Sequence, residues 1–227
     1  MEIKDFDINK DNTLEYQFIN LQRQIKPDFL IEAGAFEATF SNTLSKELGI
    51  PAVAFEASKY AYNYFKNTSY KNVNYLNLAI SDKEELLHIY LDSRTEKNPQ
   101  QNSSILKKFK KDNKYLVPHK IMATSLDRYF EKSQNNFSRA SLWIDVEGAN
   151  DKVLSGARKT LSKCISIFIE TENDTVWQNH YVNWNTEKVY KFLDTHGFQL
   201  VSSESVYENQ SNCIFIRKDH LENYKTS

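Results

Sequence analysis

Short apolar runs rich in Val, Ile and Phe recur along this chain, and most of those in its first two thirds are followed by a segment with helical spacing. The first run covers Phe29–Ile31 and the next covers Ala52–Phe55, with helical spacing over Ala38–Leu48 between them. This alternation is typical of parallel strands joined by crossover helices. The sequence therefore predicts an α/β fold with a mainly parallel, doubly wound sheet that is covered on both faces.

The same alternation continues toward the carboxyl end. Further strands are expected at Val73–Leu78, Leu86–Leu91, Lys120–Ala123, Leu142–Val146 and Ile165–Ile169. Further helices are expected at Lys59–Lys66, Ser125–Phe130, Asn150–Leu161 and Thr186–Thr195. The last two apolar runs, Phe198–Ser202 and Cys213–Arg217, are joined by a polar stretch, so we expect them to pair antiparallel at the end of the sheet.

The length of 227 residues suits a single domain over residues 1–227. Within it we expect a helical N-terminal extension over residues 1–27 and a polar loop or lid over residues 92–119. The two cysteines, Cys164 and Cys213, lie in apolar runs and are expected to be free, buried thiols.

Charge and hydropathy limit the partners and the compartment. The net charge of −1 gives no electrostatic reason to expect a nucleic-acid partner. No apolar run approaches the roughly 20 residues that a membrane span needs, and the first residues are acidic and polar, so a cytoplasmic protein without a membrane span is expected. The oligomeric state is left open.

Acidic side chains follow most of the predicted strands. They are Glu32, Glu56, Asp82, Asp145, Glu147 and Glu170. In an open parallel sheet, ligands bind beyond the carboxyl ends of the strands, so these residues should lie at one edge. A single acid there is often only a solvated surface residue. Six together favour a binding site.

Glu56 is the most informative of these acids. It ends the second predicted strand, 24 residues beyond Glu32, where a carboxylate can accept hydrogen bonds from the vicinal hydroxyls of a ribose. Gly34 is the only glycine in the loop after the first strand, so the GxGxxG fingerprint of a pyrophosphate site is missing. S-adenosylmethionine carries no phosphate. The pattern therefore favours it over NAD.

Several short segments resemble, in order, the successive motifs of FkbM-type methyltransferases. They are Glu32–Ser41, Ala54–Ala57, Leu78–Asp82, Thr124–Asp127, Ile144–Ala149 and Val153–Ala157. The resemblance covers roughly Phe29–Glu170. It implies a Rossmann-like class I methyltransferase fold, S-adenosylmethionine as methyl donor, and O-methylation of sugars, lipid-linked glycans or polyketide-type products.

The resemblance also implies roles for individual residues at the cofactor. Gly34 and Ala35 would approach it through their backbone, Glu32 would hold its amino group directly or through water, Glu56 would hold its ribose, and Ser81 and Asp82 would lie near its adenine. Phe36 and Ala57, beside these motif positions, and Asp145 complete the predicted cofactor-binding residues. The chain departs from the family in having Glu32 where aspartate is general, and Phe36 and Ala38 where asparagine and glycine are general.

Methyl transfer to a hydroxyl needs an aligned acceptor and a group that takes its proton. Asp145 and Glu147, which the resemblance places between cofactor and acceptor, are the first candidates for this base. Glu170 and His180 are the next, although a single histidine is more often structural. Asp145, Glu147 and Glu170 could instead gather a divalent cation, but we predict metal-free catalysis and no metal site.

The acceptor is expected to be a small molecule or glycan. Trp177, Tyr181 and Trp184 could stack on a sugar ring, or they could form a hydrophobic plug that packs their loop onto the sheet. Two rival functions remain. One is a scaffold protein that kept the methyltransferase fold without catalysis, and the other is a nucleotide-dependent oxidoreductase, which the missing glycine fingerprint disfavours.

Overall fold

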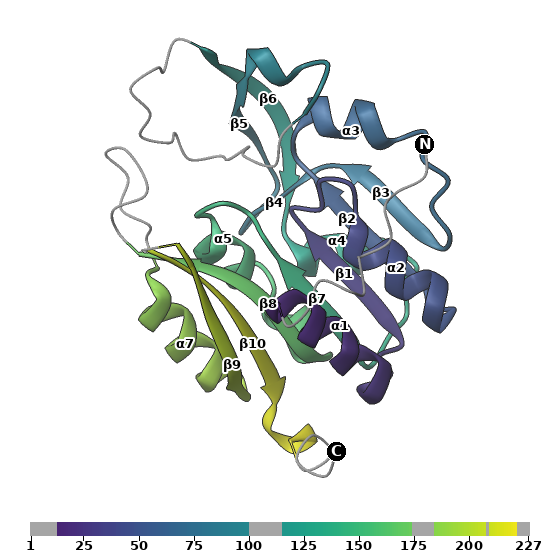
Figure 1. Cartoon of the computed structure of the whole chain (residues 1–227), viewed down its shortest axis with the longest axis vertical. Helices are drawn as coiled ribbons and strands as arrows, with labels where there is room; N and C mark the ends of the chain where they lie inside the picture. The colour runs from purple at the N-terminus through teal and green to yellow at the C-terminus, as the bar shows by residue number, and fades with distance from the viewer. Residues whose placement is uncertain (1–12, 100–114, 174–183, 208, 222–227) are drawn as a thin grey trace.

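A computed structural model describes residues 13–99, 115–173, 184–207 and 209–221 of the chain (Figure 1). In this part of the chain, seven strands form one large sheet in the order β3-β2-β1-β7-β8-β10-β9. Their bounds are β1 Phe29–Ala33, β2 Ala52–Glu56, β3 Val73–Asn77, β7 Ala140–Ile144, β8 Cys164–Glu172, β9 Phe198–Tyr207 and β10 Gln210–Arg217. The five strands from β3 to β8 are parallel, and β10 is antiparallel to both β8 and β9. The predicted mainly parallel sheet and the antiparallel pair at its end are confirmed.

The strand order reverses between β1 and β7. From β1 the chain passes to β2 and β3 on one side, and it later returns to β7 and β8 on the other side. Ala33, the last residue of β1, lies opposite Phe55 of β2 and Ile144 of β7. The carboxyl ends of these strands therefore meet at the switch point where open α/β sheets bind ligands.

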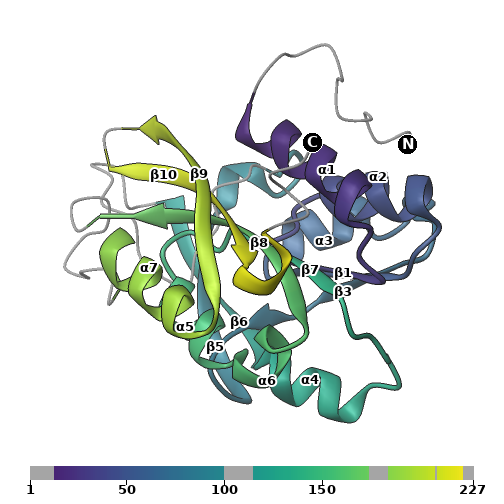
Figure 2. The same cartoon turned by 90° about the horizontal axis from the view of Figure 1, so that it is seen from below.

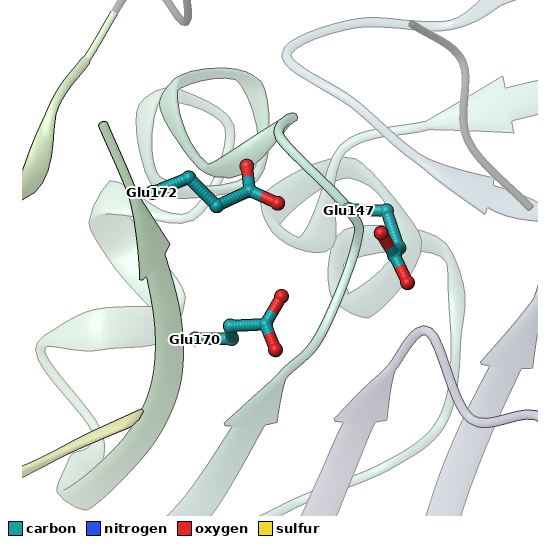
Figure 3. Close-up of side chains that lie close together, drawn as sticks. All are labelled: Glu147, Glu170 and Glu172. Atoms are coloured by element: carbon teal, nitrogen blue, oxygen red, sulfur yellow. The ribbon is translucent and has the colours of Figure 1, made fainter. Parts of the chain in front are cut away.

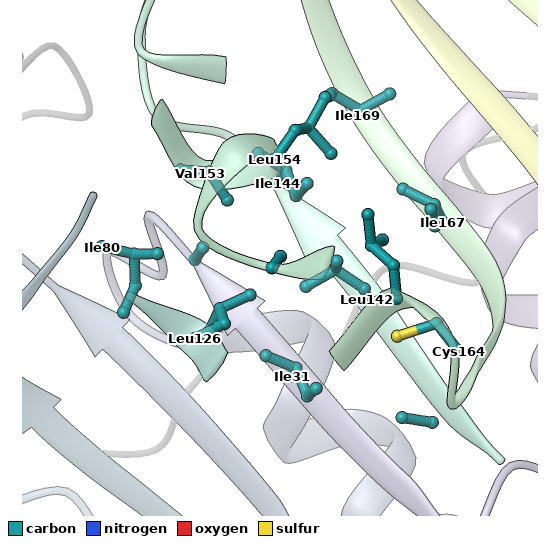
Figure 4. Packing of buried hydrophobic residues seen from close by; sticks show 14 of the residues in the cluster. Ile31, Ile80, Leu126, Leu142, Ile144, Val153, Leu154, Cys164, Ile167 and Ile169 are labelled. Carbon is teal, nitrogen blue, oxygen red and sulfur yellow. The ribbon is translucent and has the colours of Figure 1, made fainter. Parts of the chain in front are cut away.

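Helices cover both faces of the large sheet (Figure 2). One face carries α1 (Leu14–Ile25) and α2 (Thr39–Leu48), and the other carries α4 (Leu126–Lys132), α5 (Asn150–Ser155), α6 (Arg158–Leu161) and α7 (Thr186–Thr195). Because side chains alternate along a strand, Leu30 packs with α1 and α2, whereas Ile31 joins the larger core on the opposite face (Figure 4). Trp143 also enters the core and stacks on Phe168, with ring centroids 3.8 Å apart.

A second sheet of three strands lies beside the first, in the order β4-β6-β5. It contains β4 (Ala79–Ile80), β5 (Glu85–Asp92) and β6 (Leu116–Thr124), and Tyr60 of α3 (Lys59–Phe65) packs against it. The predicted polar loop over residues 92–119 is therefore too long at its carboxyl end, because residues from Leu116 onward pair with β5. A short 3-10 helix over Ser93–Thr95 follows β5. Residues 100–114 lie outside the described residues, so the lid stays a prediction.

The single helix predicted over Asn150–Leu161 is wrong. The chain forms α5 and α6 instead, with Gly156 and Ala157 between them. A Cβ atom at Gly156 would lie 2.4 Å from the carbonyl oxygen of Ser81, so the backbone here packs directly on the segment after β4. Glycine at this position permits the close contact and also favours the interruption, since it is a poor helix former.

Two other strands are longer than their apolar runs. β8 continues through Thr171 to Glu172, and β9 continues to Tyr207, because β10 pairs with both strands along these polar extensions. Cys164 and Cys213 are buried and free, as predicted. In the described part of the chain, no helix combines the length and the apolar character that crossing a membrane requires.

Candidate active site

The loop after β1 is bound to the end of β2 by a series of backbone amides. The N–H groups of Gly34 and Ala35 both donate to the carbonyl of Phe55, at 3.0 and 2.9 Å. The next amide, that of Phe36, donates to the Glu56 carboxylate at 2.7 Å. The loop and the second strand therefore form one unit at the switch point, and Glu56 is part of what holds the loop in place.

The conformation and the surroundings of Gly34 leave no room for a side chain. Its φ is +82°, and a Cβ atom there would lie 1.6 Å from the carbonyl oxygen of Asp145. The same two segments are joined by a hydrogen bond from the Asp145 amide to the carbonyl of Ala33 at 2.9 Å. Gly34 is therefore in close contact with the backbone that follows β7. The contact with a cofactor that the sequence predicted for Gly34 stays a prediction.

Glu56 is buried, with 6% of its surface exposed, and both of its oxygens accept backbone amides. Oε2 accepts from Phe36 at 2.7 Å, and Oε1 accepts from Ser58, the N-cap of α3, at 2.5 Å. Burial raises the pKa of Glu56 to about 7, and these two hydrogen bonds oppose the rise. A carboxylate has about four lone-pair positions, so these two hydrogen bonds leave about two acceptor positions on Glu56.

Glu32 of β1 is buried and accepts a hydrogen bond from the first turn of α2. The N-cap of α2 is Ala38, which offers no side-chain acceptor, and the Glu32 carboxylate accepts the Ser41 amide in the first turn at 2.9 Å. Burial is the main reason that the pKa of Glu32 rises to about 8, and the nearby charge of Asp145 adds to the rise. The cofactor role predicted for Glu32 remains a prediction beside this observed capping role.

The buried Glu32 carboxyl should make stability fall as pH rises. Its pKa is about 8 in the folded chain against 4.5 without burial, so between these values the folded state binds more protons than the unfolded state. We expect Glu32→Gln to flatten the decline in the free energy of unfolding by up to about 1.4 kcal/mol per pH unit in this window. Urea unfolding at a series of pH values measures it, with Glu37→Gln on the same loop as control. Equal slopes in wild type and Glu32→Gln would contradict the burial effect.

Ser81 and Asp82 lie just after β4. Ser81 is fully buried, and its hydroxyl donates to Asp82 at 3.1 Å. The exposed Asp82 carboxylate lies 3.6 Å from the Lys152 ammonium of α5. The adenine contact predicted for these two residues stays a prediction.

Three carboxylates gather beyond β7 and along β8. Oxygens of Glu147, Glu170 and Glu172 lie within 4.8 Å of one another, and the side chains point toward a shared space (Figure 3). Glu147 has a φ of +54°, a conformation that costs energy in a residue with a side chain. The Gln210 amide donates to Glu170 at 3.3 Å and to Glu172 at 3.2 Å. We call these three residues the acidic cluster.

The acidic cluster differs from the acids that the sequence grouped. Asp145 was expected with Glu147 and Glu170, but Glu172 is the third member. Glu170 and Glu172 are two residues apart on one strand and therefore face the same side, a signal that was missed because β8 was predicted to end at Ile169.

The remaining candidates lie in or beside a segment that the structure leaves out. His180, Trp177 and Tyr181 lie outside the described residues. Trp184 is described, and its ring packs on the core beside Phe192, with centroids 4.7 Å apart. For this ring, the contact favours the hydrophobic plug over a sugar-stacking surface.

Comparisons with known proteins identify the family of this chain. The family model of the methyltransferase FkbM domain matches residues 24–200. The chain belongs to the FkbM methyltransferase family. This confirms the family that the sequence motifs predicted, together with the expected enzyme class, a methyltransferase dependent on S-adenosylmethionine. A search of curated protein sequences finds no significant match.

Several solved structures of similar fold are methyltransferases of low sequence identity. The precorrin-6y C5,15-methyltransferase of Geobacter metallireducens is 10% identical, with a TM-score of 0.48 over 95% of this chain and 93% of that chain. A TehB-like methyltransferase of Corynebacterium glutamicum is 11% identical, with a TM-score of 0.47 over 92% and 90%. The magnesium protoporphyrin IX methyltransferase of Synechocystis, with bound S-adenosylmethionine, is 9% identical, with a TM-score of 0.45 over 93% and 88%.

The first motif carries backbone strain. Phe36 and Ala38 both have positive φ, of +46° and +57°. Asparagine and glycine adopt this region at lower cost than phenylalanine and alanine do. The Phe36 ring lies against Phe65 of α3, with centroids 5.1 Å apart.

Proposed function

We propose that the protein transfers a methyl group from S-adenosylmethionine to a hydroxyl of a sugar, a glycan precursor or a related small molecule. The observation that carries the proposal is the buried Glu56 carboxylate, which is held by two backbone amides at the switch point of an FkbM-family fold. Its two remaining acceptor positions suit the two hydroxyls of a ribose.

The residues present suit this cofactor in other ways. The loop at Gly34 has no run of glycines for a phosphate, and S-adenosylmethionine has none to place. When bound, this cofactor supplies a methyl group on a positively charged sulfur. The carboxylates of Asp145 and Glu147, directly after β7, would favour that charge.

In this proposal the acidic cluster takes the proton of the acceptor. A hydroxyl positioned between the cofactor and β8 would donate its hydrogen bond to a carboxylate oxygen of Glu147 or Glu170, and the proton would move to that oxygen as the methyl group is transferred. Asp145 and His180 remain alternative bases.

The base assignment predicts a selective loss of turnover. We expect Glu170→Gln to lower the rate of methyl transfer by about tenfold to a hundredfold, because positioned proton transfer commonly contributes about a hundredfold or more. The affinity for S-adenosylhomocysteine, measured by calorimetry, should stay within about twofold, since Glu170 lies on β8 and Glu56 on β2. A parallel loss of affinity and rate would count against the assignment.

A divalent cation at the acidic cluster is the second candidate mechanism, and the spacing of the three carboxylates favours it. The two mechanisms differ in one simple measurement. Methyl transfer that disappears in chelator and returns with Mg²⁺ would support the cation. Full activity in chelator would remove it.

Calorimetric titration of the purified protein with S-adenosylmethionine, S-adenosylhomocysteine and NAD tests the function itself. We expect binding of the first two and none of NAD. No heat from either S-adenosyl compound would overturn the proposal and favour the non-catalytic scaffold. Mass spectrometry of cell-envelope intermediates incubated with enzyme and cofactor would then identify an acceptor by the mass gain of one methylation.

A further inference from the structure

Two tyrosines from outside the loop after β1 hold its carbonyl groups. The hydroxyl of Tyr75, on β3, donates to the carbonyl of Phe36. The hydroxyl of Tyr70, just before β3, donates to the carbonyl of Glu37 at 3.2 Å. Burial raises the pKa of both tyrosines, so both hydroxyls keep their protons and remain donors.

These contacts fall on the strained part of the loop. Phe36 and Ala38 have positive φ, and the Ala38 amide donates to the carbonyl of Ala35 at 2.6 Å. Tyr70 and Tyr75 also pack against the small buried cluster of Ala35, Ala38 and Ala54. A non-glycine residue keeps such a conformation only where its surroundings fix it, and the two tyrosines supply that support.

The backbone of Phe36 links Tyr75 to Glu56. Its N–H donates to the Glu56 carboxylate at 2.7 Å, and its C=O accepts from the Tyr75 hydroxyl. The N–H and the C=O of Phe36 belong to two successive peptide groups, which are related by the φ and ψ angles of this residue. By holding the C=O, Tyr75 helps to keep Phe36 at its positive φ, and this conformation sets the direction from which its N–H meets Glu56. The acceptor positions of Glu56 that remain for a ligand are set by that direction.

We propose that Tyr75, assisted by Tyr70, is a positioning residue for the cofactor, which holds the backbone of Phe36 in its positive-φ conformation so that Glu56 presents its remaining acceptor positions to the ribose. The proposal rests on the function proposed above. It assigns Tyr75 no contact with the cofactor. The tyrosine acts through the loop.

Calorimetry with S-adenosylhomocysteine tests the proposal, with Tyr62→Phe as matched control. Tyr62 stacks on Tyr75, with centroids 5.5 Å apart, and in the described part of the chain its hydroxyl makes no hydrogen bond to the loop. We expect Tyr75→Phe to weaken binding about fivefold to tenfold, the loss of one hydrogen bond that orders the site, and Tyr62→Phe to change it less than twofold. Equal affinities in Tyr75→Phe and wild type would overturn the proposal.

A second substitution separates positioning from general packing. Asparagine tolerates positive φ better than phenylalanine does, so a loop with Phe36→Asn should depend less on Tyr75. In the Phe36→Asn background we expect Tyr75→Phe to weaken binding by no more than about twofold. The same loss in both backgrounds would mean that Tyr75 only packs the core, and would contradict the proposal.

Hydrogen exchange of the ligand-free protein distinguishes failure of this inference from failure of the proposed function. We expect the amides of Phe36 and Ala38 to exchange faster in Tyr75→Phe than in wild type or Tyr62→Phe. If wild type bound no S-adenosylhomocysteine but this difference were present, Tyr75 would still position the loop while the cofactor assignment failed. Unchanged exchange together with normal binding would reject the role of Tyr75 alone.

Discussion

Glu56→Ala is expected to weaken the binding of S-adenosylhomocysteine more than about a hundredfold. Two hydrogen bonds from ribose hydroxyls to a buried carboxylate would be lost, and bonds to charged groups contribute about 1.5–3 kcal/mol each. The Phe36 and Ser58 amides would also lose their acceptor, while the bonds from Gly34 and Ala35 to the Phe55 carbonyl would still join the loop to β2. Isothermal titration calorimetry measures the loss of affinity.

Glu37→Ala is the matched control for this loss. Glu37 lies one residue beyond Phe36, and its carboxylate accepts a hydrogen bond from the Thr39 hydroxyl at 3.1 Å. We expect this variant to bind S-adenosylhomocysteine within about threefold of wild type, since an exposed or half-buried polar contact contributes little. Similar losses in the two variants would mean that loop order, rather than Glu56 itself, determines affinity.

Gly34→Ala is expected to lower the free energy of unfolding by more than about 4 kcal/mol, which is at the extreme of single substitutions. The new Cβ would lie 1.6 Å from the Asp145 carbonyl oxygen, and that oxygen is backbone, which cannot rotate away. The positive φ of Gly34 adds a smaller cost. Urea unfolding monitored by circular dichroism measures the change.

Gly49→Ala gives the comparison that isolates the collision. Gly49 ends α2 with a φ of +70°, but a Cβ atom there would have no neighbour within 4 Å. Its replacement should therefore cost only the conformational penalty, about 1 kcal/mol. A Gly34→Ala protein as stable as Gly49→Ala would show that the segments after β1 and β7 do not pack as described.

The sheet was predictable because its signals are local. Apolar runs such as Phe29–Ile31 and Ala52–Phe55 must be buried on both faces of a parallel sheet, and Gly49 marks the end of α2 as expected. The errors arose where pairing with a distant strand overrides composition. Leu116 begins β6 within a polar stretch because β5 lies beside it, and Gly156 interrupts a helical pattern where Ser81 lies beside it.

The candidate site was predictable in its place but less so in its detail. The carboxyl ends of parallel strands meet by topology, which is why Glu56 and Glu147 could be assigned to one edge from the sequence. Which acids come within reach of one another depends on where strands end, and Glu172 was missed for that reason. The hydroxyl of Tyr75 reaches the carbonyl of Phe36 across 39 residues of chain, and no sequence pattern indicates such a contact.

A crystal structure of the protein with S-adenosylhomocysteine tests the central claim most directly. We predict that both ribose hydroxyls lie within hydrogen-bonding distance of the Glu56 carboxylate, with the sulfur directed toward the segment that carries Asp145 and Glu147. A nucleoside bound elsewhere, or a Phe36 ring that fills the space beside Glu56 while the ligand is present at saturating concentration, would contradict it.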